Sequence, residues 1–265
     1  MIQLRRDHLG TLTSALSGNI CTLTIKSPPA NALSTDLLKD LSAQLDQIEK
    51  DNLAKAIILK GEGKFFSAGA DIKEFTSLQE AHDYQVLSKK GQALFERMET
   101  FYIPIIAQIH GAALGGGLEL AMACHMRIAT EKALLGLPEL TLGIIPGFAG
   151  TQRLPRLVGP QKAYEMILTG EPIPGTDACE WGLVNKAVKE EALDNAVLEL
   201  AKKIAAKSKP TINRVMELIP YSKSDRFDEG VRKEAEQFSE IFGSDDAKEG
   251  IQAFIEKRKP IFQDK

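Results

Sequence analysis

The chain has 265 residues, of which 43% are hydrophobic and 26% are charged, and its formal net charge at pH 7 is -3. This length and composition exclude a disordered protein and a scaffold too small to bury a core. The balanced charge gives no basic footprint for nucleic acid, and no segment has the apolar length of a membrane span or the pattern of a secretory signal. We therefore expect a cytoplasmic protein that handles small molecules, with neither nucleic acid nor a membrane as partner.

The first half of the chain alternates apolar strands with helices. Alternation over 19–26 predicts a strand that runs into a turn at Pro28-Pro29. Leucines at helical spacing predict a helix over 34–51, with Ser34 as its N-cap. Buried-type strands over 56–60 and 103–110 follow, separated by a glycine-punctuated loop (61–75) and a long amphipathic helix (about 77–99).

Past residue 192 the pattern becomes wholly helical. Four segments have helical periodicity, with Pro210 and Pro220 at helix boundaries and Ser244 as a cap; they cover 192–208, 210–219, 226–242 and 244–259. We predict an α/β core over 1–191 and a helical region over 192–265 that packs on this core or on a neighbouring subunit.

The three cysteines, Cys21, Cys124 and Cys179, are widely separated. Their number and spacing fit neither a disulfide framework nor a metal site, so we expect free thiols and no bound metal.

A cluster of glycines lies between the strand at 103–110 and the next helical segment. The sequence "GAALGGG" (111–117) matches neither a P-loop nor a dinucleotide fingerprint, and no nucleophile elbow follows it. Such glycines can expose backbone N–H groups at a helix N-terminus, where an anion or a developing oxyanion binds. They can equally serve to pack the helix tightly on the sheet. The turn before Asp71 allows the same two interpretations, as a second oxyanion donor or as a capped tight turn.

Two glutamates, Glu119 and Glu139, stand among leucines. Burying an unpaired carboxylate costs several kcal/mol, so each must be paired, protonated or functional. One interpretation is a salt bridge to Arg127, Arg153 or Lys132. The other is acid–base chemistry, which needs carboxyl groups whose pKa values are shifted by apolar surroundings and by each other. The presence of two such glutamates beside two candidate anion sites favours chemistry.

Five segments together resemble one known family. They are "FFSAGADIKEF", "IHGAALGGGLELAMAC", "LGLPELTLGIIPGFAGTQRLPRLVG", "LTGEPI" and "AFIEKRK". In this order and spacing they resemble the enoyl-CoA hydratase/isomerase, or crotonase, superfamily, and most of all bacterial short-chain enoyl-CoA hydratases of fatty-acid β-oxidation. The resemblance implies a spiral core of ββα turns, a C-terminal helical trimerisation region, and a homotrimer or dimer of trimers.

The same resemblance assigns roles to residues. The backbone N–H groups of Ala70 and Gly116 would bind the thioester oxygen of an acyl-CoA substrate. Glu119 would activate water and Glu139 would deliver a proton, with no cofactor because the thioester itself accepts the electrons. The further positions implicated in substrate binding are Ala68, Asp71, Ile72, Lys73 and Leu118, together with Phe148 beside the acyl chain and Lys257 near the phosphates of a neighbour's coenzyme A.

Two other functions compete with hydration. Relatives that only move the double bond keep one carboxylate, at the position of Glu139, so the presence of both glutamates favours hydration over isomerisation. A pathway-specific dehydratase is a variant of the same chemistry. A non-enzymatic RNA-binding relative is disfavoured by the sequence pI near 5.9.

Overall fold

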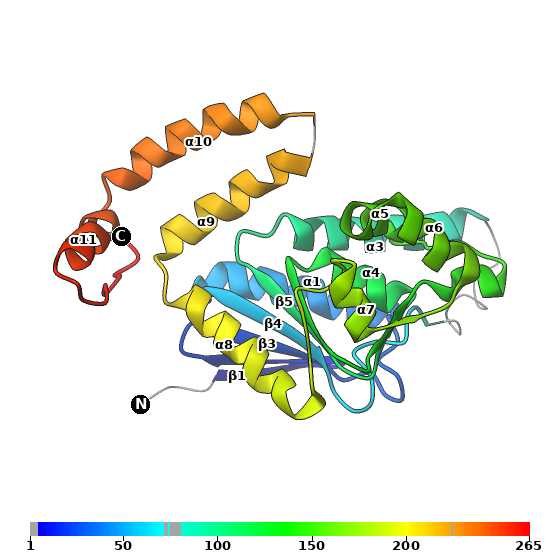
Figure 1. Cartoon of the computed structure of the whole chain (residues 1–265). Helices are drawn as coiled ribbons and strands as arrows, with labels where there is room; N and C mark the ends of the chain where they lie inside the picture. The colour runs from blue at the N-terminus through cyan, green and yellow to red at the C-terminus, as the bar shows by residue number, and fades with distance from the viewer. Residues whose placement is uncertain (1–4, 72–73, 75–80, 224) are drawn as a thin grey trace.

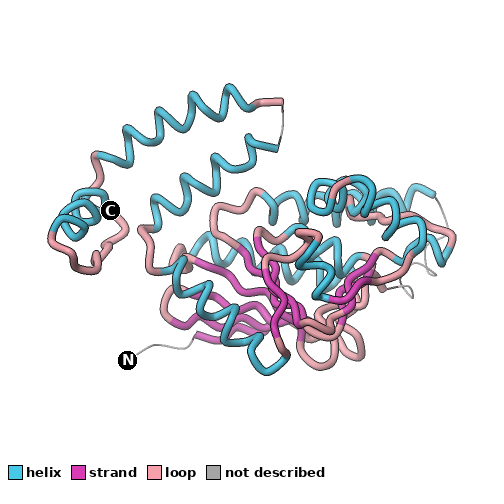
Figure 2. The backbone as a smooth tube through the Cα atoms, in the orientation of Figure 1, coloured by secondary structure: helices cyan, strands magenta, loops and turns pink. Residues whose placement is uncertain are grey.

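In the computed structural model, residues 5–71, 74, 81–223 and 225–265 are described. Strands and helices alternate as far as residue 188, and only helices follow (Figures 1 and 2). The predicted α/β core followed by helices is therefore confirmed.

The main sheet has seven strands in the order β1-β2-β3-β4-β5-β7-β10. The pairs β1–β2 and β2–β3 are antiparallel, and every later pair is parallel. A smaller sheet has the order β6-β8-β9. The strands are β1 Arg5–Leu9, β2 Leu12–Ser17, β3 Ile20–Ile25, β4 Ala56–Gly61, β5 Ile105–Ile109, β6 Ala112–Leu114, β7 Met126–Thr130, β8 Leu134–Gly136, β9 Ile173–Pro174 and β10 Lys186–Val188.

Helices cover both faces of the main sheet, because the central strands are apolar on both faces. In β4, Ile57 and Leu59 face one hydrophobic core, whereas Ala56 and Ile58 face a second one. Helices α1, α3 and α4 pack in the first core and α8 packs in the second. The helices of the core region are α1 Thr35–Asp51, α3 Ala81–Glu99, α4 Gly116–Ala123, α5 Gly150–Val158, α6 Pro160–Thr169, α7 Gly175–Glu180, and the short 3-10 helices η1 Pro138–Leu142 and η2 Glu190–Ala192.

Local signals placed several helices correctly. The Ser34 hydroxyl accepts a hydrogen bond from the Leu37 N–H at 3.2 Å and caps α1 as predicted. The Ser244 hydroxyl caps α11 in the same way, through the Ala247 N–H at 3.1 Å. The expected helix over 77–99 is confirmed from Ala81 onward, and its expected first turn lies outside the described residues.

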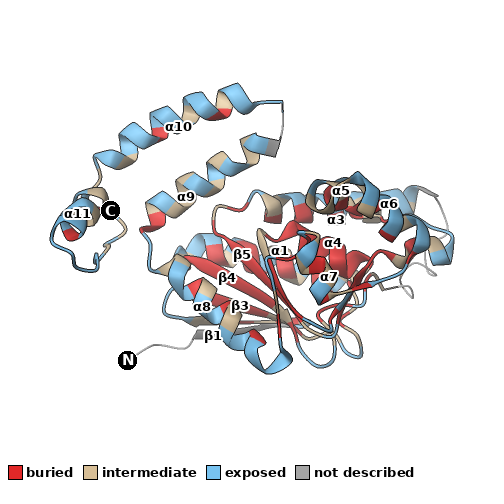
Figure 3. Ribbon diagram, in the orientation of Figure 1, coloured by how far each residue is buried: buried red, intermediate tan, exposed pale blue. Residues whose placement is uncertain are grey.

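The C-terminal helices are α8 Leu193–Ala205, α9 Lys209–Leu218, α10 Phe227–Phe242 and α11 Asp245–Ile255, with the 3-10 helix η3 Ile219–Lys223 after α9. Helix α8 packs on the sheet, whereas α9, α10 and α11 extend away from it (Figure 1). Figure 3 shows that α10 is exposed over most of its length. Its exposed side chains include four large apolar ones, Phe227, Val231, Phe238 and Phe242.

The glycine-rich turn before α4 lies directly against the loop that contains Ala70. Isolated parallel bridges join Ser67 to Ala113 and Leu33 to Ala70, so this loop runs beside β6. A Cβ atom on Gly117 would lie 2.4 Å from the Ser67 carbonyl oxygen, which is closer than atoms can approach. Glycine at this position therefore lets α4 pack tightly, as one of the two interpretations of the motif proposed.

We expect Gly117→Ala to lower the free energy of unfolding by about 1–3 kcal/mol, because the new methyl group meets a backbone atom that can move only with its loop. Thermal denaturation measures the effect. Gly147→Ala is the matched control, since a Cβ atom there would meet nothing within 4 Å. Equal losses of stability in the two variants would contradict this account of the packing.

Candidate active site

A cavity of about 840 Å³ lies where α3, α4, η1 and the Ala70 loop meet. It brings together four residues that the sequence singled out, namely Ala70, Gly116, Glu119 and Glu139. Its remaining walls are largely apolar. They are formed by Tyr84, Gln85, Leu87, Ser88 and Gln92 of α3 and by Leu142, Ile144, Ile145, Pro146, Gly147 and Phe148 from the end of η1 and the segment after it.

Two backbone N–H groups at this cavity are available to a ligand. Gly116 is the first residue of α4, where an N–H group has no acceptor within the helix. Within the part of the chain that the structure describes, neither the Gly116 nor the Ala70 N–H donates to a protein oxygen, although the neighbouring N–H groups of Gly115 and Asp71 do. A Cβ atom on Gly69 would lie 3.6 Å from the Gly116 nitrogen, so the two loops are side by side. This arrangement can hold an anion or an oxyanion at a helix N-terminus.

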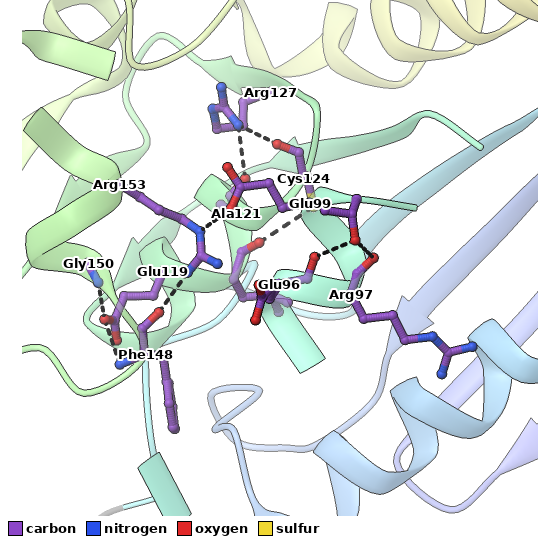
Figure 4. A network of polar contacts seen from close by, with 12 residues as sticks. Glu96, Arg97, Glu99, Glu119, Ala121, Cys124, Arg127, Phe148, Gly150 and Arg153 are labelled. Carbon is purple, nitrogen blue, oxygen red and sulfur yellow. Dashed lines mark hydrogen bonds and ion pairs between the residues drawn. The ribbon is translucent and has the colours of Figure 1, made fainter. Parts of the chain in front are cut away.

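Glu119 lies in the first turn of α4 and is only 1% exposed. Its Oε1 atom accepts hydrogen bonds from the Phe148 N–H at 2.8 Å and the Gly150 N–H at 2.6 Å (Figure 4). Burial raises the pKa of Glu119 to about 7; the nearby Glu139 carboxyl group adds to the rise, and the two N–H donors oppose it. Glycine is needed at position 150, because a Cβ atom there would lie 2.8 Å from Oε1.

Glu139 reaches the cavity from η1 and is 9% exposed. Its buried Oε2 atom has no hydrogen-bond partner among the described residues. Burial raises the pKa of this carboxyl group as well. Gly115, which has a φ of 52°, makes room for it, since a Cβ atom there would lie 3.0 Å from Oε1 of Glu139.

The salt-bridge interpretation of the two glutamates is wrong. In the described ranges neither carboxylate lies within ion-pair distance of a cationic side chain. The Arg127 guanidinium donates to the carbonyl oxygens of Leu183, Ala121 and Cys124. Arg153 pairs with Glu99, and Lys132 is exposed. The two carboxylates are thus held next to each other without a direct counter-ion, which is an arrangement that suits proton transfer.

Other predicted site residues lie apart from this group. Leu118 is fully buried in the main core and does not line the cavity, although Phe148 does. Ala68 and Asp71 belong to the Ala70 loop but are not in the cavity wall, and the Ala68 N–H donates to the Ala30 carbonyl oxygen. The predicted positions Ile72 and Lys73 lie outside the described residues.

Lys257 is exposed just after α11, at the opposite end of the molecule from α5 and α6 (Figure 1). A single chain does not bring it to the cavity. Its expected contact with a neighbour's coenzyme A stays a prediction.

The backbone of the Phe148–Gly150 loop, whose N–H groups bind Glu119, was not predicted from the sequence. Two polar contacts from α3 were not predicted either: the Ser88 hydroxyl and the Gln92 amide donate to the Gly147 carbonyl oxygen at 2.6 and 3.0 Å. The glycines that begin and end "GFAG" (147–150) are the sequence signal that could have indicated a functional backbone here.

Among the residues that the structure describes, no group of three or more His, Cys, Asp or Glu side chains could hold a metal ion. None of the helices described combines the length and the apolar character that crossing a membrane requires.

Comparison with known proteins agrees with the fold. The family model described as enoyl-CoA hydratase/isomerase matches residues 15–265. The chain is 56% identical over 259 residues to a probable enoyl-CoA hydratase of Bacillus subtilis, covering 96% of this chain and 99% of that protein. It is 41% identical to the short-chain-enoyl-CoA hydratase of Clostridium acetobutylicum, with 91% and 93% covered. The crystal structure of an enoyl-CoA hydratase from Bacillus anthracis superposes with a TM-score of 0.89 at 36% identity, with 99% of each chain covered.

The buried carboxyl group of Glu119 makes stability depend on pH. Its folded-state pKa of about 7 lies above the ordinary value of 4.5, so folding favours the protonated form and stability falls as pH rises from 4.5 through 7. Glutamine keeps the accepting oxygen but cannot ionise. We expect Glu119→Gln to be more stable than wild type at pH 8, on the order of 1–3 kcal/mol, and to differ little near pH 5.

Thermal denaturation at the two pH values measures this difference. Glu171→Gln is the control, because Glu171 is exposed on the surface. A gain in stability that is the same at pH 5 and pH 8 would contradict the assignment of the shift to ionisation of Glu119.

Proposed function

The chain belongs to the enoyl-CoA hydratase/isomerase family, and we propose that it adds water across the double bond of a trans-2-enoyl-CoA, giving a 3-hydroxyacyl-CoA, in fatty-acid β-oxidation. One observation carries the proposal. Two buried carboxyl groups, Glu119 and Glu139, line the same cavity as Ala70 and Gly116, whose N–H groups have no acceptor in the described part of the chain. Moving a double bond needs one carboxylate to carry a proton between carbons. Hydration must also take a proton from water, which accounts for the second carboxyl group.

The two N–H groups polarise the thioester. With the thioester oxygen accepting from Ala70 and Gly116, electrons are withdrawn from the double bond and the β-carbon becomes open to attack. Negative charge then collects on that oxygen, at the positive end of the α4 dipole. One such donor is commonly worth about 3 kcal/mol of transition-state stabilisation.

The carboxyl groups divide the proton transfers. Both hydrogen bonds to Glu119 reach Oε1, so Oε2 is the oxygen that takes the proton from water as water attacks the β-carbon. Two N–H donors favour the ionised form of Glu119 against the effect of its burial. We assign the base to Glu119, and we assign to Glu139, whose buried Oε2 has no hydrogen-bond partner among the described residues, the acid that protonates the α-carbon. The thioester accepts the electrons, so the step requires no other cofactor.

Crotonyl-CoA and purified protein test the reaction, through the loss of the conjugated-enoyl absorbance. We expect turnover by wild type, and a loss of at least about a hundredfold in Glu119→Gln and in Glu139→Gln, because each removes one general acid or base. Glu171→Gln should turn over like wild type, and circular dichroism verifies the fold of each variant.

Mass spectrometry of the product separates hydration from its competitors. Hydration adds the mass of water, and isomerisation does not. Absence of any mass gain with enoyl-CoA substrates would overturn the hydratase assignment.

We also propose that the chain forms a homotrimer or a dimer of trimers. The support is the exposed apolar face of α10, where the rings of Phe238 and Phe242 lie 5.6 Å apart and both are more than half exposed. Contiguous apolar surface of this kind marks an interaction site. Light scattering should give a mass of three or six chains at micromolar concentration, and a monomer would refute the proposal.

A further inference from the structure

The loop of residues 148–150, which binds Glu119, has a backbone conformation that its surroundings must stabilise. Ala149 has a φ of 71°, which is uncommon for a residue with a side chain. Its neighbours Phe148 and Gly150 supply the two N–H groups that reach Oε1 of Glu119. Loss of the left-handed turn at Ala149 would rotate one or both donors away from the carboxylate.

A buried arginine holds this loop. Arg153 is 8% exposed, and its Nη1 donates to the Phe148 carbonyl oxygen at 2.8 Å (Figure 4). Its Nε donates at 3.0 Å to Oε2 of Glu99, the last residue of α3. The arginine therefore links α3, α5 and the loop, and a buried guanidinium needs such a counter-ion.

The same pair acts on Glu119 through charge. Burial is the largest influence on the pKa of Glu119 and raises it; of the charged groups that face it, Glu139 raises this pKa and Arg153 lowers it. Glu99 balances the charge of Arg153 and also lies within electrostatic range of Arg127. The charges thus follow one another as Glu99, Arg153, Glu119 and Glu139, from the end of α3 to the cavity.

We propose that Arg153 and Glu99 are positioning residues for Glu119: Arg153, held by Glu99, fixes the loop whose N–H groups orient the carboxylate, and the opposite charges of the pair act on that carboxylate from behind the cavity. This inference rests on the proposed function, in which Glu119 must be ionised to take a proton from water. Neither Arg153 nor Glu99 lines the cavity, and Arg153 reaches its wall through the Phe148 carbonyl oxygen.

The pH profile of kcat/KM with crotonyl-CoA tests the inference. Wild type should lose activity as pH falls through about 7, where Glu119 becomes protonated. Arg153→Met removes the positive charge, so the acidic limb should move to higher pH. Glu99→Gln keeps an oxygen for the Arg153 Nε but leaves the guanidinium unbalanced, so the limb should move to lower pH. We expect each shift to be at least about 0.5 pH unit.

A second arginine variant separates position from charge. Arg153→Lys keeps the charge but cannot make both hydrogen bonds, so we expect kcat to fall at least about tenfold with the limb near its wild-type pH. Arg156→Met is the matched control, because Arg156 lies on the same helix and is exposed. Its profile should equal that of wild type.

The inference would be overturned if the acidic limb moved in the same direction in Arg153→Met and Glu99→Gln, or moved in neither. A merely structural role does not predict that the two variants shift the limb in opposite directions. If wild type adds no water to any enoyl-CoA, the proposed function fails and the pair is tested on stability instead. The melting temperature of wild type should stop falling above a pH of about 7, which is set by the folded-state pKa of Glu119. This upper end of the fall should move down in Glu99→Gln and up in Arg153→Met, and should stay near its wild-type value in Arg153→Lys, which keeps the charge. If this pH were the same in Arg153→Met and Glu99→Gln as in wild type, the role of the pair would be refuted independently of activity.

Discussion

The burial of two carboxyl groups in one cavity, with no direct counter-ion among the described residues, is the constraint on which the rest of this structure depends. An isolated buried carboxylate is too costly to persist unless hydrogen bonds replace its water. Glu119 receives two backbone N–H groups and Glu139 is held largely by apolar surroundings, so both have raised pKa values. The core around them must be rigid enough to keep these donors in place. This explains why the site lies at the N-termini of helices that pack against a sheet.

The three glycines before and within α4 show how one short motif meets several demands. Gly115 makes room for the Glu139 carboxyl group, Gly116 exposes its N–H to the cavity, and Gly117 lets the helix approach the Ser67 carbonyl oxygen. The packing interpretation of this motif is confirmed at Gly117, whereas the anion-site interpretation, which concerns Gly116, stays a prediction. Tight packing of α4 is what carries the Gly116 N–H to the side of Ala70.

The sequence predicted what depends on local pattern. The cap at Ser34, the apolar strand over 56–60 and the C-terminal helices follow from spacing and capping within a few residues. The choice of partner for Arg153 could not be predicted, because Glu99 is 54 residues away and local periodicity has no information about which buried charge an arginine meets. Ala149 was missed for a different reason, since an alanine in the left-handed region is held there by its surroundings and not by its own preference.

The order of charges behind the cavity explains how a pair of glutamates can differ in role. Glu99 forms an ion pair with Arg153. Arg153 donates to the Phe148 carbonyl oxygen and the Phe148 N–H donates to Glu119, so the arginine stabilises the carboxylate without a direct hydrogen bond to it. A direct salt bridge would have held Glu119 ionised far below neutral pH and made it a weak base. Burial and the Glu139 carboxyl group raise the pKa of Glu119, whereas the two N–H donors and, most weakly, Arg153 lower it. The balance leaves this pKa at about 7, where a carboxylate can both take and return a proton.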